Sequence, residues 1–176
     1  MRYVVVCVVK GEAGVSNNNL RKEIWEKFQA RSSKLPAHFT IKAPFEHEGE
    51  LTELTDALEK FCHSEKAAPF RLEGYDHFDN RVIYMHVNMS KAGKAMHDRL
   101  IDTMGEVPYI HFDSKDGKDK TFHVTIASKR LQPLYETVWQ YVQQYPCDYD
   151  CQFDNVSIYK WEDETWKLYR EFLLGE

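Results

Sequence analysis

The chain has 176 residues, of which 43% are hydrophobic and 29% are charged, and its formal net charge is −5. This length is typical of one compact domain or of two small lobes that share a core, and the composition excludes a disordered chain. The acidic balance argues against a non-specific binder of long nucleic acid, which needs a broad basic surface.

The first half of the chain predicts alternating strands and helices, from valine-rich runs, alternating polarity and helical spacing of apolar residues. In chain order the predicted segments are a strand at 2–9, a helix capped within Ser16–Asn19 and reaching Phe28, a strand at 38–45, a helix at 51–61 and a strand at 70–78.

A similar order then returns. The predicted segments are a strand at 81–89, a helix capped by Ser90 and reaching 104, a strand at 121–128, a helix opening at Pro133 and reaching 145, and strands at 152–161 and 166–174 joined by the acidic turn 162–164. We interpret this order as an internal duplication within a single domain, 1–176, of two facing α+β lobes, roughly 1–80 and 81–176.

One tetrapeptide is also duplicated. His38-Phe39-Thr40-Ile41 returns as His123-Val124-Thr125-Ile126, about half the chain length further on. Because side chains alternate between the two faces of a strand, each strand would present an imidazole and a hydroxyl on one face and apolar residues on the other. Two such strands related by a pseudo-twofold axis would place both imidazoles around one cleft.

Phosphodiester chemistry can use this set of side chains. A base must deprotonate the attacking water or hydroxyl and an acid must protonate the leaving oxygen, and histidine suits both because its pKa lies near neutrality. The threonine hydroxyls can hydrogen-bond the non-bridging phosphate oxygens. By the same alternation Lys42 would share the face of His38, which makes it a secondary candidate for a phosphate contact. No metal ion or other cofactor is expected.

The paired motif, its separation and the duplicated α+β layout resemble the two-histidine (2H) phosphoesterase superfamily, which includes 2′-5′ RNA ligase-like proteins and cyclic phosphodiesterases. The resemblance implies a bilobal α+β fold whose antiparallel sheets, flanked by helices, line a central cleft. It implies that His38 and His123 are catalytic and that Thr40 and Thr125 bind phosphate. The expected reaction is hydrolysis, or reversible transfer, at 2′,3′-cyclic phosphates or 2′-5′ linkages of RNA ends or small nucleotides.

Other interpretations stay open. The same scaffold could be an inactive module that binds nucleotides or RNA ends, the two histidines could be ordinary strand residues, and the six remaining histidines could serve a metal-dependent hydrolase. The loop 114–120 is either a mobile, lysine-bearing flap over the phosphate or a solvated surface loop. This loop and Lys129-Arg130 are the local basic patches that a phosphorylated ligand needs.

The remaining expectations concern the setting of the protein. The longest apolar run, 4–9, is too short to span a bilayer and lacks the features of a signal peptide, so we expect a cytoplasmic, monomeric protein with no membrane partner. A disulfide between Cys147 and Cys151 is one option, but reduced cysteines are expected in that compartment. Tyr159, Trp161 and Trp166 are candidates for base stacking, although we expect most of them to serve packing.

Overall fold

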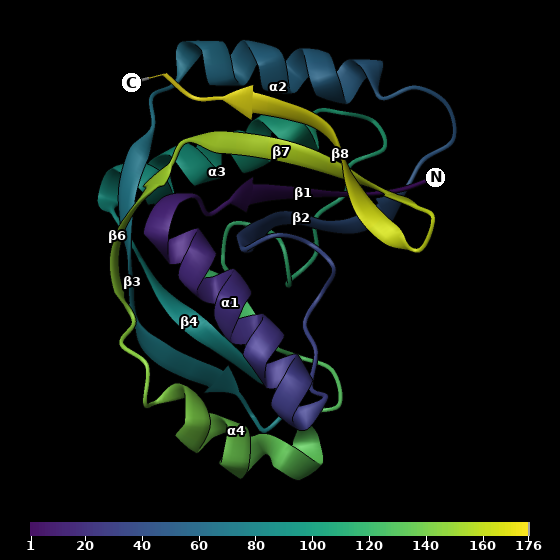
Figure 1. The fold of residues 1–176 in the computed structure, drawn as a ribbon. Helices are drawn as coiled ribbons and strands as arrows, with labels where there is room; N and C mark the ends of the chain where they lie inside the picture. The colour runs from purple at the N-terminus through teal and green to yellow at the C-terminus, as the bar shows by residue number, and fades with distance from the viewer. Residues whose placement is uncertain (176) are drawn as a thin grey trace.

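A computed structural model describes residues 1–175, and Figure 1 shows its arrangement of strands and helices. In chain order the elements are β1 (Arg2–Val8), α1 (Gly11–Phe28), β2 (His38–Glu46), α2 (Thr52–Ser64), β3 (Ala68–Phe78), β4 (Val82–Met89), α3 (Lys91–Gly105), β5 (His123–Ala127), the 3-10 turn η1 (Gln132–Leu134), α4 (Tyr135–Val142), β6 (Asp148–Phe153), β7 (Asn155–Glu162) and β8 (Thr165–Leu173).

The strands form two four-stranded antiparallel sheets. The first has the order β2-β1-β7-β8 and the second the order β5-β4-β3-β6. Each sheet takes strands from both halves of the chain, because β7 and β8 join the first sheet and β3 joins the second. The two strands that begin with the repeated histidines, β2 and β5, are both edge strands, and they contact each other across the gap between the sheets.

The helices cover the sheets and close one shared core. In Figure 1, α2 lies along β8 and β7, whereas α1 crosses in front of β4 and ends near α4. The largest apolar cluster includes residues of both sheets and of all four α-helices, and burial of this surface is the main favourable contribution to folding. None of the helices in 1–175 has both the length and the apolar character that crossing a membrane requires. The two antiparallel sheets and the helices that cover them confirm the expected α+β fold.

The first helix begins earlier than predicted. It starts at Gly11, and the expected cap residues lie inside it, with Asn17 fully buried. Serine and asparagine are poor helix formers, but the Asn17 amide donates to the carbonyl of Thr125 at 3.3 Å, a tertiary contact that the sequence pattern does not reveal. Gly14 permits the close packing, since a Cβ there would lie 2.2 Å from the Val9 carbonyl oxygen.

The predicted strand 152–161 is two strands that belong to different sheets. β6 pairs with β3 in the second sheet, and β7 pairs with β1 in the first, so the chain crosses between sheets at Asp154. Ser90 does cap α3, accepting a hydrogen bond from the Gly93 N–H at 3.0 Å. The acidic turn between β7 and β8 has positive φ at Asp163 and Glu164, the backbone of a tight hairpin.

Candidate active site

The two tetrapeptides lie at the start of β2 and on β5, and their predicted alternation is confirmed. The histidine and threonine side chains are half-buried, whereas their neighbours are buried in the core. Those buried neighbours are Phe39, Ile41, Val124 and Ile126. Phe39 fixes the first strand with three edge-to-face aromatic contacts, including one to Phe122 at 5.5 Å, directly before His123.

Both imidazoles are held in the same way. Nδ1 of His38 donates to the Pro36 carbonyl at 2.8 Å, and Nδ1 of His123 donates to the Thr121 carbonyl at 2.9 Å, so each ring bonds the residue two positions before it. A carbonyl can only accept, so this bond places the proton of the neutral ring on Nδ1. Nε2 of each ring has no hydrogen-bond partner among the described residues, which leaves it available to exchange a proton.

Burial lowers the pKa of both imidazoles, but by different amounts. Burial is the main cause that lowers the pKa of His38 to about 4; the charges of Arg21 and His123 act in the same direction and the Pro36 carbonyl opposes them. Burial also lowers the pKa of His123, with the Thr121 carbonyl opposing and the Lys120 ammonium adding to the shift. Both rings are therefore neutral near pH 7 in the unliganded protein, and the shift is larger at His38.

His123 has two aromatic neighbours and also lines a cavity. Its ring lies 5.0 Å from that of Phe78 and 5.2 Å from that of Tyr84, measured between ring centres. The cavity has a volume of about 850 Å³. The cavity is lined by Phe78, Arg81, Val82, Ser114, Lys115, Asp119, Lys120, Thr121, His123 and Ser128. Its size suits a nucleotide-sized ligand.

Lys42 does not share the face of His38, and the expectation that it does is wrong. Val5 pairs with Lys42 but the next residue, Val6, pairs with Thr40, so Ile41 is the extra residue of a β-bulge. The bulge moves Lys42 to the opposite face. There its ammonium forms a buried ion pair with Asp116 at 2.7 Å and is not free to contact a phosphate.

The loop 114–120 is held against β2. The Asp116 carboxylate is 1% exposed and accepts hydrogen bonds from Lys42, from the Ala43 N–H at 2.9 Å and from the Asp113 N–H at 2.9 Å. Burial alone would raise the pKa of Asp116, but these donors more than offset it, so its pKa is lowered. The loop is neither wholly solvated nor a free flap, because its central aspartate is part of the core.

Besides the exposed Lys115, this loop brings Lys120 to the cavity beside His123. The Lys120 ammonium donates to the carbonyls of Thr40 and Ile41, and its side chain lines the cavity beside His123. Burial lowers the pKa of Lys120 to about 8, with the Asp116 carboxylate opposing the shift. Lys120 thus connects the two histidine strands, since it directly precedes the β5 segment and bonds the backbone of β2.

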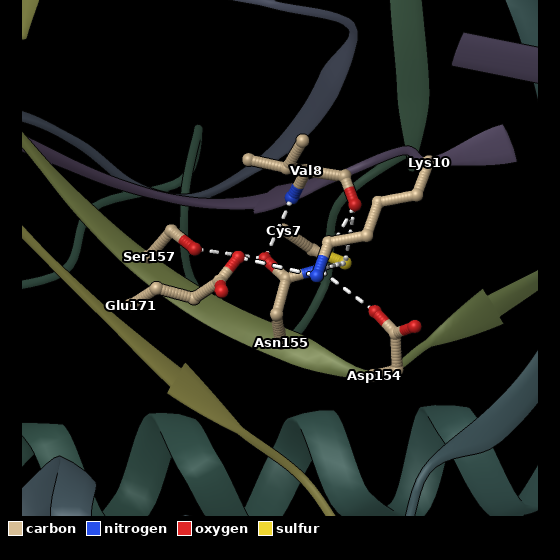
Figure 2. Close-up of polar contacts among 7 residues, drawn as sticks. All are labelled: Cys7, Val8, Lys10, Asp154, Asn155, Ser157 and Glu171. Atoms are coloured by element: carbon tan, nitrogen blue, oxygen red, sulfur yellow. Dashed lines mark hydrogen bonds and ion pairs between the residues drawn. The ribbon is translucent and has the colours of Figure 1, made fainter. Parts of the chain in front are cut away.

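A buried polar cluster supports the strand next to His38. Figure 2 shows the contacts of Asn155 with Val8 and Ser157. The side-chain oxygen of Asn155 accepts from the Val8 N–H at 3.0 Å and from Ser157 Oγ at 2.8 Å. Its amide nitrogen donates to the Val8 carbonyl at 2.9 Å. Val8 is the cross-strand partner of His38. Asn155 therefore fixes the end of β1 beside the first histidine, at the point where the chain passes from β6 of the second sheet to β7 of the first.

The other histidines and aromatic residues have local contacts. His86 lies directly opposite His123 on β4, so it shares the cleft-facing side of that sheet, and His97 is fully buried in α3 with its ring 4.8 Å from Phe122. In the described part of the chain, no three His, Cys, Asp or Glu side chains are grouped as metal ligands. Tyr159 is buried in a small apolar cluster, and Trp161 and Trp166 pack on each other at 5.2 Å.

Several residues near the two histidine strands carried no motif in the sequence. Arg21 and Asn17 lie in a polar stretch of α1, and Tyr84 lies in an ordinary apolar strand, so neither spacing nor composition marks them as neighbours of the histidines. Lys120 had a signal, since it is the last lysine of the basic loop and directly precedes the second histidine strand. The four cysteines are free and buried.

Comparison with known proteins identifies the family. The sequence model of the 2′-5′ RNA ligase superfamily matches residues 16–165. The chain belongs to this superfamily. Among similar proteins, one from Bacillus pumilus named "Putative phosphoesterase" is 25% identical over 181 aligned positions, which cover 100% of this chain and 99% of that protein. The 2H phosphoesterase resemblance inferred from the tetrapeptides is thereby confirmed.

Solved structures share the fold of this 2′-5′ RNA ligase superfamily member. The protein TT0787 of Thermus thermophilus matches with a TM-score of 0.70 at 14% identity, over 100% of both chains. E. coli LigT complexed with 3′-AMP matches with a TM-score of 0.62 at 12% identity, over 99% of this chain and 98% of LigT. At such low identity the likeness concerns the fold alone.

Proposed function

We propose that this chain is a metal-independent phosphodiesterase that opens 2′,3′-cyclic phosphates or cleaves 2′-5′ linkages at RNA ends or in small nucleotides. The observation that carries the proposal is the matched pair of imidazoles on two contacting strands, each with Nδ1 bound to a carbonyl and Nε2 free. Two histidines with unrelated structural roles would not need the same hydrogen bonding. A base and an acid that act on one phosphate both need a fixed ring with a free nitrogen.

Ring opening of a cyclic phosphate uses both rings in one step. Nε2 of one histidine takes a proton from water while the water oxygen forms a bond to phosphorus. The bond from phosphorus to one ribose oxygen breaks, and the second histidine gives its Nε2 proton to that oxygen. One proton enters the site and one leaves it, so the reaction needs no further reactant.

The surroundings of the two rings favour one assignment of roles. His38 has the more strongly lowered pKa, so it is neutral over the whole physiological range and suits the base. His123 is less strongly shifted, and a bound phosphate raises the pKa of an adjacent imidazole. His123 therefore becomes the acid when the substrate is bound.

The phosphate itself meets the two threonines and a lysine. The hydroxyls of Thr40 and Thr125 lie on the faces of the histidines, and neither has a side-chain hydrogen bond within residues 1–175. They can donate to the non-bridging oxygens, where negative charge grows during the reaction. The Lys120 ammonium adds a positive charge at the same cleft. These groups supply the stabilisation that a metal ion provides in other phosphodiesterases.

The comparisons support a nucleotide substrate. E. coli LigT, which shares this fold, has structures complexed with 3′-AMP, with NADP+ and with ATP. Each of these ligands carries a phosphate on a ribose, which is the group that the proposed reaction requires. A cavity of about 850 Å³ beside His123 is large enough for one nucleotide.

The test is to incubate the purified protein, in EDTA, with RNA oligonucleotides that end in a 2′,3′-cyclic phosphate and to identify the product by chromatography. We expect ring opening to a single phosphomonoester isomer, whose position names the leaving oxygen. Binding of the oligonucleotide without any turnover would instead support the inactive binding module. Activity that EDTA abolishes and a divalent metal restores would contradict the metal-free mechanism.

A further inference from the structure

A second hollow lies on α1 and the loop that follows it, apart from the cavity at His123. It has a volume of about 420 Å³. It is lined by Asn18, Arg21, Lys22, Trp25, Arg31, Ser32 and Ser33. Three of these seven side chains are cationic and none is acidic, in a chain whose acidic residues outnumber its basic ones, 28 to 23. The hollow is therefore positively charged, whereas the whole chain has a net negative charge.

The cations of the hollow are not neutralised within residues 1–175. Arg21 donates to Ser32 Oγ at 2.9 Å and to the carbonyls of Ser33 at 3.2 Å and Leu35 at 2.9 Å, and none of its partners is a carboxylate. Its Nε is buried and has no hydrogen-bond partner among those residues. Lys22 and Arg31 are exposed and form no ion pair there. Unpaired positive charge of this kind attracts an anion.

The hollow is connected to both histidine strands. Asn18 in its wall accepts from the N–H of Ala37, the residue directly before His38, at 3.1 Å. On the other side, the backbone of Arg31 pairs with Lys129, just beyond the end of β5, through hydrogen bonds of 2.8 and 2.9 Å. An anion in the hollow therefore lies beside the same two strands that carry the candidate base and acid.

An aromatic surface accompanies the charges. Trp25 is 37% exposed, although it is a large apolar side chain, and the Arg31 guanidinium lies 4.0 Å from the centre of its ring. Exposed bases of single-stranded nucleic acid stack on such indole and guanidinium planes. Phosphate-binding cations beside a stacking surface are the combination that holds a nucleotide unit.

We propose that this hollow binds the phosphodiester and base next to the reacting phosphate, so that the preferred substrate is the end of an RNA strand and not a mononucleotide. This inference rests on the proposed function, because it assigns the neighbouring unit of the same substrate. The hollow then supplies binding energy away from the reacting centre, while the histidine cleft holds the terminal phosphate.

The experiment compares two substrates that both end in a 2′,3′-cyclic phosphate, a dinucleotide and a mononucleoside. The double variant Lys22→Gln/Arg31→Gln removes two charges of the hollow, and Lys27→Gln removes one charge from the same helix outside it. We expect the ratio of kcat/KM for the dinucleotide to that for the mononucleoside to fall about tenfold in the double variant, on the scale of two exposed charge–phosphate contacts. The ratio should not change in Lys27→Gln.

The outcomes separate this inference from the proposed function. A ratio that the double variant leaves unchanged, or an equal loss on both substrates, would overturn the subsite. If the wild type opens neither substrate, the proposed function fails, and fluorescence anisotropy of a labelled tetranucleotide with a 3′-phosphate decides the subsite. Weaker binding in the double variant, with a log–log salt slope reduced by about 0.7 per lost phosphate contact, would support it, and equal binding would overturn it.

Discussion

The pKa of His38 is lowered more strongly than that of His123, and this difference governs the pH dependence of the proposed reaction. The productive form of the free protein has a neutral base and a protonated acid. If His38 is the base, activity rises as pH increases through about 4. If His123 is the acid, activity falls as pH passes its pKa, which burial places below the ordinary histidine value of about 6.5.

The first prediction is a bell-shaped profile of kcat/KM whose maximum lies on the acidic side of neutrality. The profile of kcat should extend to higher pH, because the bound phosphate raises the pKa of the adjacent imidazoles. Initial rates measured across the pH range, at low and at saturating substrate, give the two profiles. A kcat/KM maximum well above neutrality would contradict the assignment of these two rings.

At the scale of elements, the ion pair of Lys42 and Asp116 holds the loop before β5 against β2. Replacing Asp116 by Asn leaves the Lys42 ammonium buried without a counter-ion. We expect the free energy of unfolding, measured by urea denaturation, to fall by about 3–5 kcal/mol. Asp119→Asn changes an exposed residue of the same loop and should cost less than about 0.5 kcal/mol.

This ion pair also makes stability depend on pH in a defined direction. The folded protein lowers the pKa of Asp116, so its contribution is present above the pKa of the unfolded chain and is lost as pH falls through the folded value. The gap in stability between the wild type and Asp116→Asn should therefore narrow in acid. A gap that stays constant down to acidic pH would show that the carboxylate charge is not its source.

The crossing of the chain from β6 to β7 depends on Asn155. Asn155→Ala would remove the side-chain partner of the half-buried Val8 N–H, one donor to the Val8 carbonyl and the acceptor of the buried Ser157 hydroxyl. We expect a loss of about 3 kcal/mol in the free energy of unfolding. Asn88→Ala, at an exposed position of β4, is the matched control and should be nearly neutral. Equal effects of the two variants would refute the role given to the buried cluster.

Sequence patterns predicted those parts of the molecule whose periodicity is local. The histidine strands follow from alternation, which correctly put Phe39 and Val124 in the core and left His38 and His123 half-buried. The start of α1 was missed because its asparagine-rich first turns are stabilised by tertiary contacts and not by helix propensity. The break at Asp154 was missed because an apolar pattern does not show which sheet a strand joins.

Departures from regular geometry also limited the prediction of the site. Alternation holds for His38 and Thr40 but fails for Lys42, because a bulge at Ile41 moves Lys42 to the opposite face of the strand. The contribution of Lys120 depends on a loop fixed by a buried aspartate, and no spacing rule brings residue 116 to residue 42. Contacts between segments distant in the sequence are thus the part of the site that sequence patterns did not predict.

At the scale of the whole molecule, each sheet presents one histidine strand at its edge, and the two edges meet. The proposed pseudo-symmetry of the lobes, roughly 1–80 and 81–176, concerns the order of elements, since strands of both halves mix within each sheet. The mixing joins the two sheets through one core, so the distance between the histidines is set by the packing of the entire chain.

The central claim is that His38 and His123 act as one unit on one phosphate. It is tested most directly by kcat/KM for ring opening of a 2′,3′-cyclic phosphate in His38→Ala, His123→Ala and the double variant, with His63→Ala, an exposed histidine of α2, as control. We predict that kcat/KM falls about 10²–10⁴-fold in each single variant. In the double variant it should fall little further than in the less active of the two single variants. The control should keep full activity. Full activity in either single variant, or losses that multiply in the double variant, would contradict the account.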